Sequence, residues 1–163
     1  MSRALTGLTS GMLAGAAGST ALNLFTYSQQ AVKGTASGAT PDQAAQAVIQ
    51  AVGGEVPGTP DQVQNRLEGL GPVSGLGVGL GIGALGGLLR ALGVKIPITA
   101  APVVLGLGAM AVSDGVMTAV GVTNPRTWTA GSVVQDAIPH LVYGAVTVLA
   151  LHRMIDPSTQ QVR

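Results

Sequence analysis

Four long stretches of this sequence are nearly free of charge, and each is long enough to cross a lipid bilayer as a helix. They cover residues 4–27, 72–89, 97–122 and 128–151, and Asp114 and Asp136 are the only charged residues inside them. A helix rises 1.5 Å per residue, so about 20 apolar residues span a bilayer core about 30 Å thick. The sequence therefore predicts an all-α integral membrane protein, a four-helix bundle forming one domain over residues 1–163.

The composition excludes several other classes of protein. Only 9% of the residues are charged, whereas about 25% is usual in soluble domains, so a dispersed water-soluble fold is not expected. The formal net charge of +1 provides no basic surface for nucleic acid. The absence of cysteine excludes disulfides and thiolate chemistry. No motif predicts a cofactor, and membrane lipid is the expected surrounding.

The basic residues predict how the spans are oriented. The stretch 4–27 is expected to be a retained span rather than a cleaved signal, because its apolar run continues past the small residues at 14–16. Four spans put both termini on one side. That side carries more Lys and Arg (Arg3, Arg90, Lys95, Arg153 and Arg163) than the other (Lys33, Arg66 and Arg126). The positive-inside rule therefore predicts a multi-pass plasma-membrane protein with both termini in the cytoplasm.

The only sizeable polar segment, residues 28–71, contains the same helix-start signal twice. Thr-Pro-Asp-Gln occurs at 40–43 and again at 59–62, where Thr is suited to the N-cap, Pro to the first turn and Gln to a capping box. Two short helices are predicted, over about 41–52 and 60–70. They are expected either to cover the outer ends of the spans or to form a docking surface for an extracytoplasmic partner or a lipid headgroup.

Glycines recur every four residues in the first two spans. Small residues at this spacing allow two helix backbones to approach closely, which drives helix association in lipid. We expect these two glycine faces to pack on each other within one chain, with contact to another copy or to a partner membrane protein as the alternative. The predicted packing residues are Gly7, Gly11, Gly15, Gly75, Gly79, Gly83 and Gly87.

The last two spans contain ionisable residues, which are costly in lipid and usually face the interior of a bundle. If these spans are antiparallel neighbours, Asp114 and Asp136 lie at the same depth, and His140 shares a helix face with Asp136. Pro139 lacks an N–H and predicts a kink beside them. The full predicted polar cluster consists of Asn23, Asp114, Gln135, Asp136, His140 and Tyr143.

Two interpretations of this cluster remain open. In the first, its members pair with one another or with Arg126 and hold the bundle in register. In the second, two carboxylates and a histidine that titrates near neutrality handle protons or a ligand. The set is not specific enough to predict a metal site. Ser113, Asp114 and His140 include the residue types of a serine hydrolase, but there is no G-x-S-x-G or H-E-x-x-H motif.

The fourth predicted span also carries a resemblance. Trp128, followed by D-x-x-P-H-x-x-Y-G over residues 136–144, is similar to a segment of small bacterial inner-membrane proteins of the YagU-like type and of an actinobacterial group. Residues 124–127 and 21–27 are similar to the actinobacterial group as well. The resemblance implies a four-span protein without a settled activity. The expected role is accessory or structural, a small proton-coupled transporter is the alternative, and an enzyme is not favoured.

Overall fold

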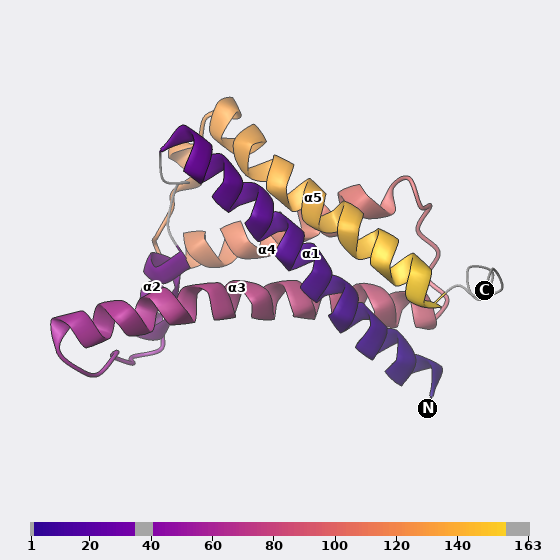
Figure 1. The fold of residues 1–163 in the computed structure, drawn as a ribbon, viewed down its shortest axis with the longest axis horizontal. Coiled ribbons are helices and arrows are strands. Elements are labelled where there is room, and N and C mark those ends of the chain that lie inside the picture. The colour runs from indigo at the N-terminus through magenta and orange to yellow at the C-terminus, as the bar shows by residue number, and fades with distance from the viewer. Residues whose placement is uncertain (1, 35–40, 156–163) are drawn as a thin grey trace.

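The computed structural model describes residues 2–34 and 41–155, and this part of the chain is all-α (Figure 1). No strand occurs within it, so the all-α part of the predicted fold class is confirmed. Its helices are α1 (Arg3–Lys33), α2 (Pro41–Ala51), α3 (Pro60–Ala91), α4 (Ala101–Ala119), the short 3-10 helix η1 (Pro125–Thr127) and α5 (Ala130–Ile155).

Three of these helices, α3, α4 and α5, are long and apolar enough to cross a membrane. The helix α1 contains the predicted span 4–27 and is longer than it, but it does not reach the same level of apolarity. The reason is its composition, because glycine, serine and threonine take many of the places that leucine and valine occupy in the other helices. By length and composition the described residues therefore contain three candidate spans, where the sequence pattern predicted four.

The capping signals locate two helix ends correctly. The Thr59 hydroxyl accepts from the Gln62 N–H, and the Gln62 side chain accepts from the Thr59 N–H at 3.0 Å, which completes the predicted capping box. The helix α2 ends at Ala51, within one residue of the prediction. Gly53 follows it with φ of 77°, a conformation that glycine adopts without strain. The other predicted cap, Thr40, lies outside the described residues.

The predicted break between residues 70 and 72 is wrong. Residues 60–70 and 72–89 belong to one continuous helix, α3, with Pro72 inside it. Proline removes one backbone hydrogen bond, the one to the carbonyl of Glu68, and this residue is exposed. The loss is confined to that site, so the helix continues. Gly71 packs against α2, since a Cβ at this position would lie 2.6 Å from the carbonyl carbon of Pro41.

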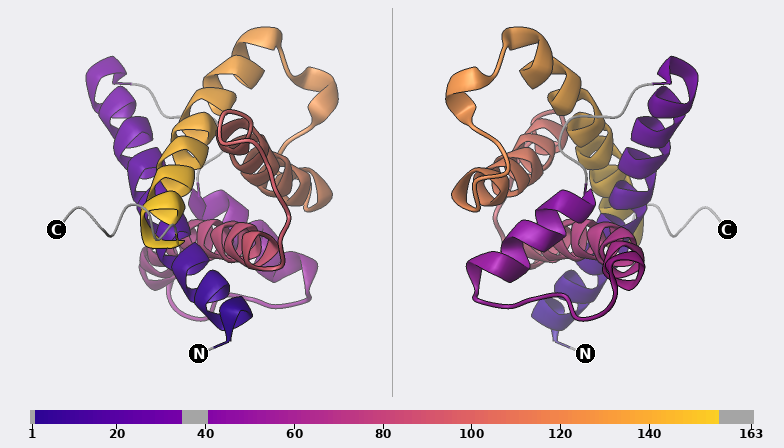
Figure 2. Two further views of the ribbon diagram at one scale, coloured as in Figure 1. Left: turned by 90° about the vertical axis from the view of Figure 1, so that its right-hand side faces the viewer. Right: turned by 90° about the vertical axis from the view of Figure 1, so that its left-hand side faces the viewer.

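The long helices alternate in direction between the two ends of the molecule (Figure 1). Gly7, Gly11 and Gly15 of α1 face Gly87, Gly83 and Gly79 of α3 in antiparallel order. The helices α4 and α5 are also antiparallel, and α5 packs along α1 (Figure 2). The start of α1, the end of α3 and the end of α5 therefore gather at one end of the molecule, which we call the basic end.

The interior consists mainly of small residues, and the large apolar side chains point outward. Gly, Ala, Ser and Thr occupy most buried positions, with Tyr143 the largest fully buried side chain among the described residues. Leucines and valines on every long helix are exposed, for example Leu24 at 69%, Leu85 at 52% and Val104 at 50%. This is the reverse of a water-soluble core and matches helices that pack through small residues in lipid.

Candidate functional site

Two glycines bring α4 and α5 into close contact. A Cβ at Gly106 would lie 2.6 Å from the carbonyl oxygen of His140, and one at Gly144 would overlap the backbone of α4. Because the helices are antiparallel, residues two turns beyond Gly106 reach the level of the early part of α5. This packing places Ser113 and Asp114 of α4 beside Asp136 and His140 of α5, and we call these four residues the polar cluster.

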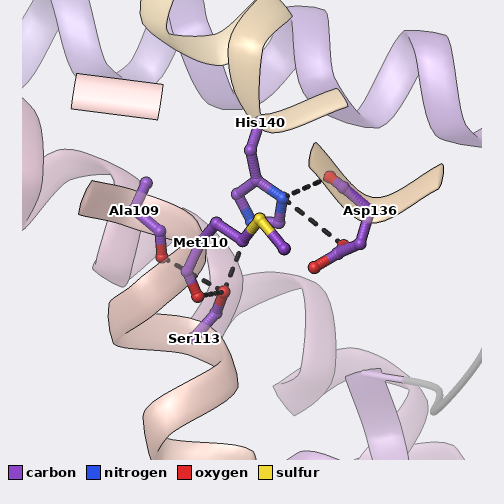
Figure 3. Close-up of polar contacts among 5 residues, drawn as sticks. All are labelled: Ala109, Met110, Ser113, Asp136 and His140. Atoms are coloured by element: carbon purple, nitrogen blue, oxygen red, sulfur yellow. Dashed lines mark hydrogen bonds and ion pairs between the residues drawn. The ribbon is translucent and has the colours of Figure 1, made fainter. Parts of the chain in front are cut away.

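His140 makes contacts through both ring nitrogens (Figure 3). Its Nδ1 lies 2.8 Å from the backbone carbonyl oxygen of Asp136 and 3.4 Å from the carboxylate Oδ1 of the same residue. Both of these atoms are acceptors, so Nδ1 carries the proton and donates. The other nitrogen, Nε2, lies 3.3 Å from the hydroxyl oxygen of Ser113 across the helix contact.

The Ser113 hydroxyl fits both protonation states of His140. Its oxygen lies 3.1 Å from the carbonyl of Ala109 and 3.0 Å from that of Met110 (Figure 3). When His140 is neutral, Ser113 donates to Nε2. When His140 is protonated, Nε2 donates to Ser113, and the hydroxyl turns to a carbonyl of its own helix. The histidine can therefore gain or lose a proton without leaving a ring nitrogen unpaired.

Asp114 joins the cluster from the α4 side. Its carboxyl lies close enough to Asp136 and His140 to interact electrostatically with both. The side chain of His140 is only 13% exposed, whereas that of Asp136 is 41% exposed. The cluster therefore extends from an interior imidazole to a carboxylate at the surface of the bundle.

The other predicted members of the cluster lie elsewhere. Tyr143 points away from it and donates to the carbonyl oxygen of Gly79 in α3 at 2.7 Å, so it joins α5 to α3. Asn23 and Gln135 make no hydrogen bond to the cluster within the described ranges. Arg126 is exposed, and no ion pair joins it to Asp136 within the same ranges. The proposed guanidinium partner is thus not used.

The residue that the predicted cluster omitted is Ser113. The arrangement of Ser113 at Nε2 and Asp136 at Nδ1 has the connectivity of a serine-hydrolase triad. All three residues lie inside helices, where backbone N–H groups are taken up by helical hydrogen bonds. Free pairs of backbone N–H groups of the kind that stabilise an oxyanion are not found in such helix interiors. The Ser113–His140 contact joins α4 to α5.

Six of the seven predicted packing glycines meet at the contact between α1 and α3. A Cβ at Gly11 would overlap the carbonyl of Gly83, and one at Gly15 would overlap that of Gly79. The contact lies within one chain. Gly75 differs from the others, because it is exposed and has no heavy atom of another element within 4 Å of the place its Cβ would take.

Residues 2–34 and 41–155 contain no group of three His, Asp or Glu side chains placed to hold a metal ion. Comparison of the chain with protein-family models, curated proteins and solved structures finds no match.

Proposed function

We propose that this chain is a four-span integral protein of the bacterial inner membrane, with both termini in the cytoplasm and an accessory or structural role. The observation that carries the proposal is the inverted distribution of side chains. Small residues fill the helix contacts while Leu, Val and Ile cover the outside of α3, α4 and α5. Lipid is the solvent in which such a surface is stable.

The inclusion of α1 as the fourth span rests on its contacts. It packs along α3 through glycines and along α5 through Gly18, and a Cβ at Gly18 would lie 2.8 Å from the Tyr143 ring. Several of its threonine hydroxyls are satisfied within the helix. Thr9 donates to Leu5 at 3.0 Å and Thr20 to Ala16 at 2.9 Å, which lowers the cost of placing them in lipid.

The proposed orientation rests on where the cations lie. Arg3, Arg90 and Lys95 all line one pocket at the basic end, whereas Arg66 lies near the start of α3 and Arg126 in the loop between α4 and α5. The positive-inside rule then puts the basic end in the cytoplasm. A relationship to the YagU-like proteins belongs to the same proposal and rests on residues 124–144.

The structural role is supported by the side chains that connect the helices. Tyr143 joins α5 to α3, and His140 joins α5 to Ser113 of α4. Together with the glycine contacts, these bonds fix the relative positions of four helices, as expected of a rigid bundle that supports a membrane assembly.

A second candidate, proton-coupled permeation, is favoured by one observation. The ring of His140 keeps its hydrogen bonds in both protonation states and lies beside two carboxylates, both of which are partly exposed. A group of this kind can exchange protons without breaking the helix contact.

Topology labelling tests the span count, and the chain suits it because it contains no cysteine. We expect a membrane-impermeant maleimide to label Gln50→Cys in intact cells. Ser2→Cys and Thr99→Cys should be labelled only after permeabilisation. If α1 does not span, Ser2→Cys lies on the same side as Gln50→Cys and is labelled with it, which contradicts the four-span arrangement.

A further inference from the structure

A pocket at the basic end is lined by three cations. Arg3, Arg90 and Lys95 surround a cavity of about 640 Å³, and none of its described lining residues is acidic. The cations come from the start of α1, the end of α3 and the loop that follows α3. Such a pocket attracts an anion with more than one oxygen, because guanidinium groups bind phosphate oxygens in a two-pronged manner.

The backbone explains why these cations converge. Gly93 adopts φ of 91° just after α3, and its N–H donates to the carbonyl of Arg90 at 3.0 Å, so the chain turns back and brings Lys95 to the pocket. On the other side, a Cβ at Gly7 would lie 2.5 Å from that of Ala91. This approach of α1 to α3 carries Arg3, one turn earlier, to the same pocket.

An apolar groove continues from the basic pocket between α3, α4 and α5. It has a volume of about 310 Å³, and its walls include Leu85, Leu89, Val104 and Leu105. Gly108 widens the groove, because a Cβ added at this glycine would have no heavy atom of another element within 4 Å. The residues that line both cavities are Arg90, Val94 and Ile96.

We propose that this chain binds an anionic glycerophospholipid at the basic end, with the phosphate in the basic pocket and an acyl chain in the apolar groove. The inference rests on the proposed membrane placement, in which the pocket lies at the cytoplasmic headgroup level and the groove along the bilayer. A basic pocket between membrane helices is the kind of site that binds anionic headgroups.

The charge of the pocket selects among lipids. A zwitterionic headgroup brings an ammonium into a pocket lined by three cations, so repulsion offsets part of the phosphate attraction. A soluble phosphate gains the charge contacts but leaves the apolar groove without an apolar occupant. An anionic lipid satisfies both cavities.

The test uses the full chain purified in an uncharged detergent, with the melting temperature followed during titration. The probes are dioleoylphosphatidylglycerol, dioleoylphosphatidylcholine and inorganic phosphate. We expect the anionic lipid alone to raise the melting temperature substantially. Lys95→Gln should weaken its apparent affinity about fivefold, the effect of one cation at a membrane surface. Arg126→Gln, at the other end of the molecule, should leave it unchanged.

A second pair of variants tests the groove. Gly108→Leu places a side chain in the groove and should weaken binding of the anionic lipid, whereas Gly115→Leu on the same helix, also in open space, should not. Equal protection by both lipids, equal protection by phosphate, or equal effects of Lys95→Gln and Arg126→Gln would overturn the proposal. Topology labelling that still gives four spans would then show that the membrane placement stands and only the lipid site fails.

Discussion

At the scale of single residues, the position of a polar side chain on its helix, more than its residue type, determines which neighbouring helix it contacts. His140 and Tyr143 lie three positions apart on α5 but serve different contacts, His140 toward α4 and Tyr143 toward α3. Their spacing in the sequence groups them, because three residues are close to one helical turn. Spacing cannot separate them, since which neighbour each side chain meets depends on how α1, α3 and α4 lie around α5.

The polar cluster provides a prediction about single residues. Asp136→Asn combined with His140→Ala removes the link to Ser113, and we expect it to destabilise the bundle in detergent by about 0.6–1.7 kcal/mol, the range for bonds between membrane helices. Gln135→Ala, at an exposed neighbouring position, is the control and should have no effect. Thermal unfolding followed by circular dichroism measures both.

The same double variant separates the two candidate functions when reconstituted in vesicles under a pH gradient. A structural role predicts that neither the wild-type chain nor the variant carries protons. Proton flux that is present in the wild type and lost in a variant that is still folded would contradict the structural role and support permeation. An unchanged melting temperature would also count against the structural role.

At the scale of elements, local signals predicted where a helix starts. Longer-range packing determined where one helix continues into the next and which helices contact each other. The capping box at Thr59 and Gln62 was predictable because it depends on four consecutive residues. The continuity of residues 60–70 with 72–89 in one helix was not predictable. Proline is common at the first position of a helix, so Pro72 indicated a new start, and the free-energy cost of proline inside a helix depends on its surroundings. Glycine spacing predicted the contact of α1 with α3, but not that Gly75 would lie beyond it.

The α3 glycines provide a matched pair for this contact. Gly83→Ala places a methyl against the backbone of Gly15 at 2.6 Å, so we expect a destabilisation of about 1–3 kcal/mol, as for overpacking. Gly75→Ala occupies open space, and it should be neutral or stabilise by up to about 1 kcal/mol, because alanine favours the helix. Thermal unfolding in the same detergent compares them. Equal effects of the two changes would show that the close contact of α1 with α3 does not exist in the protein.

At the scale of the whole molecule, the fold places small residues inside and large apolar residues outside, with cations gathered at one end. The charge-free stretches made three candidate spans predictable from the sequence. The pocket and groove at the basic end were not predictable, because they arise where α1, α3, α4 and α5 meet. All of these features acquire a function only if lipid surrounds the bundle.

Fractionation of cells that express the full chain tests this requirement most directly. After washing with alkaline carbonate, which releases peripheral proteins, we expect the chain to stay in the membrane pellet and to be extracted only by detergent. Its helical circular-dichroism signal should be lost to aggregation when the detergent is removed. A chain that is released by carbonate, and that stays helical and monodisperse in plain buffer, would contradict the account.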